Sequence, residues 1–194
     1  MSASTDRSIA LWDTRAGSSP LFNLRYHLSP VSDLLLGNRS ESLMVSAGAD
    51  GSLATWDFRV ISGSAQEATS VVPDGEGRSS RTIRTAVATM DHLNPFKRTT
   101  NCGIVRLCRA VGRHEFCFLS VSDDGIVNEW DASTGRKMST HKTGHCDAIS
   151  GFSTFSSKDG LRQSKHSNVG ESSGGSITCS WDGTVRLRRL SRRK

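Results

Sequence analysis

Short runs of aliphatic and β-branched residues, separated by turn signals, recur along this chain and predict β-strands. The strongest runs are Val31–Leu36, Ser42–Ala47, Gly103–Arg109, Glu115–Val121, Ala148–Phe155 and Ser176–Ser180. Weaker runs at Leu21–Tyr26, Thr82–Thr89 and Arg136–His141 predict further strands. No apolar run reaches the roughly 18 residues that a membrane span requires. The pattern therefore predicts an all-β protein without a membrane span.

Four of the strand-forming segments align with one another without gaps, which indicates an internal repeat. They are Ser4–Asp13, Gly48–Asp57, Ser122–Asp131 and Ser180–Arg189. Each copy has an Asp at the head of a turn, where a carboxylate can accept backbone N–H groups. Gly follows that Asp in three copies, a strong hairpin signal, whereas Arg7 stands there in the first copy.

Three copies end on a Trp-Asp dipeptide, at Trp12, Trp56 and Trp130. The four phased copies resemble the WD-repeat (Trp-Asp) β-propeller family over most of the chain. The resemblance implies a propeller built from four-stranded antiparallel blades. The dipeptide Trp181-Asp182 is out of register, because Arg188 and Arg189 occupy the Trp-Asp positions of the fourth copy.

In that family a hydrogen-bonded set of His, Asp, Ser or Thr, and Trp holds each blade together, and the resemblance carries the set over by position. The second repeat has all four members, and Asn101 stands about where the His of the third repeat belongs. The fourth repeat lacks the Trp, and the first begins too late in its blade to include a His. The structural residues are, by repeat, Asp6 and Trp12; His27, Ser46, Asp50 and Trp56; Ser120, Asp124 and Trp130; and His145, Thr178 and Asp182.

The repeats end near residues 13, 57, 131 and 189, and their spacing locates two insertions. Asp6 and Asp50 are 44 residues apart, an ordinary repeat length, but the next two intervals are 74 and 58 residues. The polar segments 61–81 and 156–173 account for the excess and are predicted to be flexible inserted loops. About three and a half blades result, so we expect part of a larger propeller, a truncated product or closure by oligomerisation.

Charge and cysteine content narrow the class of protein. The formal net charge is +6, yet the last nine residues, 186–194, hold six basic residues and no acid, so the rest is neutral. We interpret 186–194 as a basic tail that is a nuclear-import signal, a nonspecific anchor or a solvated terminus.

Five cysteines without a C-x-x-C spacing argue against a disulfide framework and a thiolate zinc site. They favour a reducing compartment, the cytoplasm or the nucleus.

Candidate catalytic and metal-binding residues are few. His141, His145 and Cys146 superficially resemble a metal cluster, but the propeller resemblance makes His145 a blade residue. Asp123 and Asp124 are adjacent turn residues, whose side chains diverge, so we interpret them as turn chemistry. No phosphate-binding loop or nucleophile motif occurs. The sequence therefore predicts a noncatalytic protein with no cofactor and no metal.

The residues after Trp-Asp provide the most specific functional signal. Trp12-Asp13-Thr14-Arg15 and Trp56-Asp57-Phe58-Arg59 each end on Arg, whereas Ser133 takes this place in the third copy. This pattern resembles a motif of propellers that dock on the damaged-DNA-binding adaptor of cullin–RING ubiquitin ligases as substrate receptors. In the alternative interpretation, Arg15 and Arg59 cap strand ends and pair with a neighbouring acid.

The leading functional hypothesis is a protein–protein interaction scaffold of the WD-repeat type, acting within a multiprotein complex. The alternative is a substrate receptor of a cullin–RING ligase, with Arg15 and Arg59 binding the adaptor. A second alternative is nucleic-acid or ribonucleoprotein association through the basic tail. Alternating aromatic and basic residues on a strand, which a stacking platform needs, are missing, and this argues against nucleic acid.

Overall fold

The computed structural model describes residues 1–13, 15, 20–37, 42–63, 71–73, 79–83, 86–92, 102–110, 116–156 and 174–190. In this part of the chain, sixteen strands form four sheets, and one helix, α1 (Phe58–Gly63), follows β6. The predicted all-β class is confirmed. The strands that the sequence predicts most strongly are observed with bounds shifted by at most two residues.

Two of the sheets have four antiparallel strands each. The second sheet comprises β4 (Val31–Leu36), β5 (Leu43–Gly48), β6 (Ser52–Asp57) and β9 (Ala88–Asp91). The third comprises β10 (Ile104–Arg109), β11 (Cys117–Ser122), β12 (Ile126–Asp131) and β13 (Lys137–Lys142).

The sheets at the two ends of the chain differ from this pattern. The first has the order β1-β2-β3-β8-β7, from β1 (Ser2–Ala3), β2 (Ser8–Leu11), β3 (Phe22–Arg25), β7 (Val71–Pro73) and β8 (Ser79–Ile83). The fourth has three strands, β14 (Ile149–Ser156), β15 (Gly174–Ser180) and β16 (Val185–Leu190).

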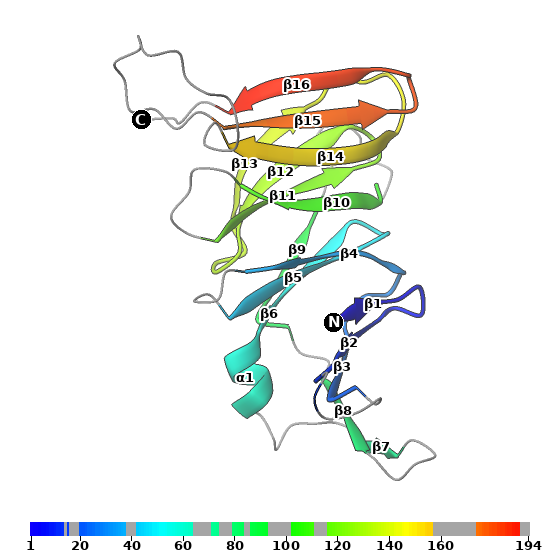
Figure 1. The fold of residues 1–194 in the computed structure, drawn as a ribbon, viewed down its shortest axis with the longest axis vertical. Coiled ribbons are helices and arrows are strands. Elements are labelled where there is room, and N and C mark those ends of the chain that lie inside the picture. The colour runs from blue at the N-terminus through cyan, green and yellow to red at the C-terminus, as the bar shows by residue number, and fades with distance from the viewer. Residues whose placement is uncertain are drawn as a thin grey trace, which may run out of the picture.

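The four sheets stack in chain order along the long axis of the molecule, from β1–β3 at one end to β14–β16 at the other (Figure 1). The first strand of the third sheet, β10, contacts β4 of the second sheet on one side and β14 of the fourth on the other. Apolar clusters fill the spaces between the sheets, and burying each large side chain contributes about 1.5–3 kcal/mol. Trp56 belongs to the cluster between the first and second sheets, and Trp130 to the one between the second and third.

The turns at the heads of the repeats require a left-handed backbone. Gly51, Gly125 and Gly183 have φ angles of 85°, 81° and 75°. Arg7, which replaces Gly in the first repeat, has the same conformation with a φ of 73°. A residue with a Cβ atom in the left-handed region costs roughly 1–2 kcal/mol relative to Gly. The turn of the first repeat therefore keeps the conformation of the others although Arg7 is strained.

Segment 61–81, predicted as a flexible inserted loop, contains regular structure where it is described. Ile61 lies in α1 and is buried in the cluster beside Trp56. β8 pairs in parallel with β3, and β7 pairs with β8, so both extend the first sheet. The prediction was wrong here because β8 pairs with the edge of β3, a long-range contact that the polar composition of the segment does not indicate. Residues 157–173 of the second predicted loop lie outside the described residues.

Two further predictions need correction. The last strand of the second sheet is β9 (Ala88–Asp91) rather than Thr82–Thr89, because Met90 is the residue that reaches the core and pairs with Leu53. The basic segment 186–194 is not a tail throughout, because residues 186–190 lie in β16 and pair with β15.

One face of the fourth sheet exposes apolar side chains. Ile177 pairs with Leu187, and Cys179 pairs with Val185, so these side chains share a face. Val185 is 70% exposed and Leu187 is 63% exposed. The opposite face carries Ser176 and Thr178, which are buried. An apolar sheet face that is open to water favours association.

We therefore expect the purified chain to self-associate, and Leu187→Lys to reduce that association by placing a charge on the apolar face. Sedimentation velocity over a concentration series provides the measurement. Leu28→Lys is the matched control, because Leu28 is 84% exposed and lies outside this face. A wild-type chain that stays monomeric, or an equal effect of both variants, contradicts the expectation.

Candidate functional site

The second sheet contains a buried hydrogen-bond network centred on Ser46. The Trp56 indole N–H donates to Ser46 Oγ at 2.9 Å, and His27 Nε2 lies 2.7 Å from the same oxygen. Asp50 reaches the histidine through Ser52: the Ser52 hydroxyl donates to Asp50 at 2.7 Å and lies 2.7 Å from His27 Nδ1. The structure thus brings together the four predicted residues of this repeat, with Ser52 between the acid and the histidine.

Burial and hydrogen bonds set the charges of this network. Burial lowers the pKa of His27, and the nearby Asp50 carboxylate opposes that shift. Burial alone would raise the pKa of Asp50, but hydrogen bonds from Ser52 and Ser29 outweigh it and lower the pKa. Both shifts favour a neutral His27 imidazole beside an ionised Asp50 carboxylate.

The Trp–Ser–His part of this network recurs in the third sheet, without the link to the aspartate. The Trp130 indole N–H donates to Ser120 Oγ at 2.7 Å. The histidine of this set is His92, whose Nδ1 lies 2.6 Å from Ser120 Oγ. Asn101, which the sequence places near the histidine position, lies outside the described residues. Asp124 accepts a hydrogen bond from the Ser122 hydroxyl and heads its turn.

His92 is the structural residue that sequence reasoning missed. His27 follows β3 by two residues and precedes β4 by four, whereas His92 directly follows β9 and precedes β10 by twelve. His27 stands 23 residues before Asp50, and counting back 23 residues from Asp124 points to Asn101, whereas counting forward from the preceding strand finds His92. Burial lowers the pKa of His92 to about 4. Its Nε2 is buried and has no hydrogen-bond partner among the described residues.

The fourth sheet has the histidine set without an indole. His145 Nδ1 lies 3.0 Å from an oxygen of Asp182, and Nε2 lies 2.8 Å from Thr178 Oγ1. A hydrogen bond from Thr184 is the main cause that lowers the pKa of Asp182. The pairing register aligns Thr178 with Arg186 as it aligns Ser120 with Asn128. Arg188 consequently occupies the position of Trp130.

The first sheet contains a serine that the sequence analysis did not assign. The Trp12 indole N–H donates to Ser2 Oγ at 3.0 Å, and Asp6 accepts hydrogen bonds from Ser8. Ser2 precedes Trp12 by ten residues, as Ser46 precedes Trp56 and Ser120 precedes Trp130. The ten-residue spacing was therefore the signal that would have found Ser2.

Arg15 and Arg59 form local ion pairs after their Trp-Asp dipeptides. Arg15 Nε lies 3.4 Å from Asp13, and Arg59 Nη2 lies 2.7 Å from Asp57. The arginine side chains are 91% and 71% exposed. The backbone N–H of each arginine also donates to the same aspartate, as the N–H of Ser133 donates to Asp131. Arg59 lies in the first turn of α1.

Cys102, Asp123 and Asp124 form a further cluster that the sequence analysis did not connect. One ligand atom from each lies within 4.8 Å of the others. The cluster forms because the Asp123 N–H donates to the Gly103 carbonyl at 3.0 Å, which holds the turn beside Cys102. A tetrahedral zinc site would need a fourth ligand.

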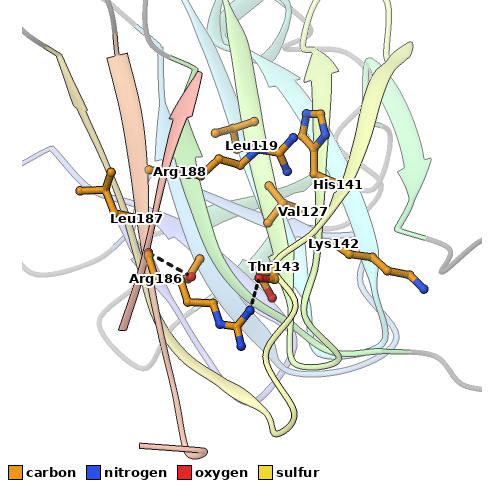
Figure 2. Close-up of a pocket in the computed structure, with 10 residues that line it drawn as sticks. Leu119, Val127, His141, Lys142, Thr143, Arg186, Leu187 and Arg188 are labelled. Carbon is orange, nitrogen blue, oxygen red and sulfur yellow. Dashed lines mark hydrogen bonds between the residues drawn. The ribbon is translucent and has the colours of Figure 1, made fainter. Parts of the chain in front are cut away.

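A cleft lies between the third and fourth sheets (Figure 2). It encloses about 460 Å³ and is lined by Leu119, Val127, His141, Lys142, Thr143, Ser176, Thr178, Arg186, Leu187 and Arg188. Arg188 extends across it toward His141, whereas the side chain of Leu187 projects to the other side of β16. A second cavity of about 440 Å³ lies beside Tyr26, Asp50 and His92.

The fold is similar to that of a known propeller. The crystal structure of the WD40 β-propeller domain of Doa1 superposes with a TM-score of 0.55 at 19% sequence identity, covering 95% of this chain. This chain spans 44% of the length of that one. No family model matches the sequence. The chain has the fold of a partial WD40 β-propeller.

The sheets are therefore blades, and the hydrogen-bond sets link the second and third strands of each. Because the fourth blade has Arg188 at the tryptophan position, Trp181 falls in the β15–β16 turn and is 76% exposed. No helix among the described residues is long and apolar enough to cross a lipid bilayer.

Trp56→Ala should destabilise the propeller by about 3–5 kcal/mol, because it empties the space between two blades and removes the donor to Ser46. Trp181→Ala should change the free energy of unfolding by about 0.5 kcal/mol or less, because its side chain lies in solvent. Urea denaturation of both variants provides the measurement. Equal losses of stability would mean that the register of the fourth blade is wrong.

His92 should make the folded state sensitive to acid. Its folded pKa of about 4 lies below the ordinary value of 6.5, so the unfolded chain takes up the proton first as the pH falls. The contribution of His92 to the free energy of unfolding is present in full above pH 6.5, and we expect it to decrease by about 3 kcal/mol between pH 6.5 and 4. The pH dependence of urea midpoints should be flatter in His92→Gln than in the wild type. Parallel curves for the two proteins would contradict this role.

Proposed function

We propose that this chain is a noncatalytic protein-interaction scaffold. The observation that supports the proposal is the division of its polar groups between interior and surface. The histidines, serines and tryptophans of the repeats bond to one another within blades, whereas Arg15, Arg59 and the apolar face of the fourth blade lie in solvent. Binding surfaces on a propeller reside in such exposed positions rather than in the fold itself.

Arg15 and Arg59 favour a specific form of this scaffold, a substrate receptor of a cullin–RING ubiquitin ligase. Both guanidinium groups follow the third strand of adjacent blades and are held by an aspartate two residues earlier. An exposed ion pair of this kind contributes only about 0–1 kcal/mol to stability. The pairs therefore orient the arginines at little cost, and a partner carboxylate or carbonyl can accept bidentate hydrogen bonds from them.

The pKa values agree with this arrangement. The hydrogen bond and charge of Asp57 raise the pKa of Arg59, and the hydrogen bond from Arg59 lowers the pKa of Asp57. Both groups stay charged at physiological pH. The five described cysteines are free thiols, which supports the proposed reducing location in the cytoplasm or nucleus.

The combined variant Arg15→Ala with Arg59→Ala should abolish co-purification of the ligase adaptor while the melting temperature stays unchanged. Loss of an arginine contact at a buried interface typically costs about 2–5 kcal/mol of binding free energy, which is enough to dissociate a complex of micromolar affinity. Affinity purification with mass spectrometry, on the longest form of the protein that cells make, provides the measurement.

Arg136→Ala is the matched control, because Arg136 is exposed and lies near the corresponding turn of the third blade. The variant with Lys at both positions keeps the charge but loses the bidentate geometry, so it should also fail. If the wild type never captures the adaptor, or the double alanine variant captures it equally well, the ligase proposal is wrong. In that case the scaffold proposal is tested by the other proteins that co-purify with the wild type.

A further inference from the structure

The blade histidine His92 differs from His27 in the bonding of one ring nitrogen. In the second blade, His27 Nε2 lies 2.7 Å from Ser46 Oγ, and Nδ1 lies 2.7 Å from Ser52 Oγ. In the third blade, His92 Nδ1 lies 2.6 Å from Ser120 Oγ, but Nε2 is buried with no hydrogen-bond partner among the described residues. A buried polar atom in this state needs an explanation.

The turn that faces this nitrogen lacks a hydroxyl that two other blades provide. Ser52 follows the Asp-Gly turn of the second blade, and Thr184, at the same position of the fourth, lies 3.0 Å from a histidine nitrogen. Ile126 takes this position in the third blade and cannot bond to the ring. Asp124 heads the same turn, and its carboxylate opposes the lowering of the His92 pKa that burial causes. The equivalence of the repeats thus directs the unpartnered Nε2 toward the turn that Asp124 heads.

Two potential metal ligands further distinguish this turn from that of the second blade. The backbone N–H of Asp123 donates to the Gly103 carbonyl, as the N–H of Ala49 donates to the corresponding carbonyl of the second blade. This shared bond aligns Asp123 with Ala49 and Cys102 with Ser29. Around one turn, the third blade has therefore gained a carboxylate and a thiol where the second has a methyl group and a hydroxyl.

The thiol, the carboxylates and the histidine lie in one region of the interior. Cys102, Asp123 and Asp124 each place a ligand atom within 4.8 Å of the others. A Cβ atom at Gly51 would lie 3.0 Å from the Cys102 carbonyl and 3.6 Å from the His92 carbonyl, so these two residues flank the same glycine. His92 is 3% exposed and Cys102 is 5% exposed. With His92, the three-residue cluster has the fourth ligand that a tetrahedral zinc site requires.

The hydrogen bond to Ser120 suits a histidine that binds a metal. Ser120 Oγ accepts a hydrogen bond from the Trp130 indole, and it has a second lone pair for the Nδ1–H of His92. In this tautomer Nε2 keeps its own lone pair. Metal-binding histidines have the same arrangement, in which the second ring nitrogen donates to a protein group that fixes the ring.

We propose that His92, Cys102, Asp123 and Asp124 bind one Zn²⁺ ion as a structural site. The thiol of Cys102 releases its proton to solvent, and the metal takes the sulfur, His92 Nε2 and one oxygen of each aspartate. Thiolate and imidazole select zinc over magnesium and calcium, which take oxygen ligands. The four protein ligands leave no coordination position open for a substrate, so the ion stabilises the turn. The proposal departs from the expectation, drawn from the sequence, of a chain without a metal.

The surroundings of the cluster allow the ion to enter. Zinc–ligand distances of about 2.0–2.3 Å in a tetrahedral site put ligand atoms about 3.3–3.8 Å apart, so the atoms of the cluster approach by about 1 Å on binding. The side chain of Asp123 is exposed and can make this movement. It also connects the buried sulfur of Cys102 to solvent.

Titration of the full chain with Zn²⁺, after metal has been removed with a chelator, tests this proposal. Calorimetry should show one ion bound per chain, and zinc should raise the urea midpoint of unfolding because it binds the folded state. The chain loaded with Co²⁺ instead should have the ultraviolet charge-transfer band of a thiolate–cobalt bond. It should also have the strong visible bands of four-coordinate cobalt.

Variants identify the ligands. Cys102→Ser, Asp123→Asn and His92→Gln should each weaken zinc binding by more than about tenfold, since even the loss of a group that orients a ligand costs about 10–100-fold. Cys102→Ser should also remove the charge-transfer band. Cys146→Ser and Asp147→Asn are the matched controls, because both residues are exposed in the fourth blade, and they should bind zinc as the wild type does.

A wild type that binds no zinc, a cobalt complex without the charge-transfer band, or controls as weak as Cys102→Ser would overturn the proposal. So would displacement of zinc by an equal concentration of Ca²⁺, which would mean that the aspartates bind alone. Asp123→Asn decides the outcome if another variant does not fold, because the Asp123 side chain is exposed and its backbone makes the bond to Gly103. The site shares no residue with the ligase proposal, so the two fail independently.

Discussion

The hydrogen bond from a tryptophan indole to a serine ten residues earlier is the interaction on which this structure depends. It joins the second and third strands of a blade at Ser46 and Trp56, and again at Ser120 and Trp130. The indole simultaneously fills the space against the preceding blade, so one side chain fixes both pairing register and stacking. A buried hydroxyl or indole without its partner would cost about 1–3 kcal/mol, which makes the set cooperative.

The fourth blade shows what happens when one member of this set changes. Thr178 and His145 remain bonded, so the register is preserved, but Arg188 cannot fill the space of an indole while its charge is buried. It stays exposed, and a cleft of about 460 Å³ opens beside Leu119 and Val127. Arg188 at the tryptophan position weakens the packing between the third and fourth blades. Of the two cavities described, the cleft that results is the one with a basic wall.

Local sequence signals predicted the strands and turns because both depend on neighbouring residues. Asp-Gly pairs marked the left-handed turns, and even Arg7 could be placed there by alignment with Gly51. Predictions failed where long-range contacts decide. Ile61 in α1 and strand β8 are held by the first two blades, and no local pattern records that β3 has an edge to cover. His92 was missed because the spacing to the next strand differs from that of His27.

The candidate sites also differ in whether local sequence or long-range contacts define them. Arg15 and Arg59 were identified by a local motif after Trp-Asp, and the structure pairs each with the aspartate two residues earlier. The basic cleft could not be read from the sequence, where Arg186 and Arg188 look like part of a terminal charge run. The repeat alignment placed both residues in the last strand of the fourth copy, but only the structure shows that they face Val127 and His141 across a blade interface. The strand positions that hold Ala54 and Trp56 in one blade hold two arginines in another, so a repeated fold acquires different surfaces without changing its backbone.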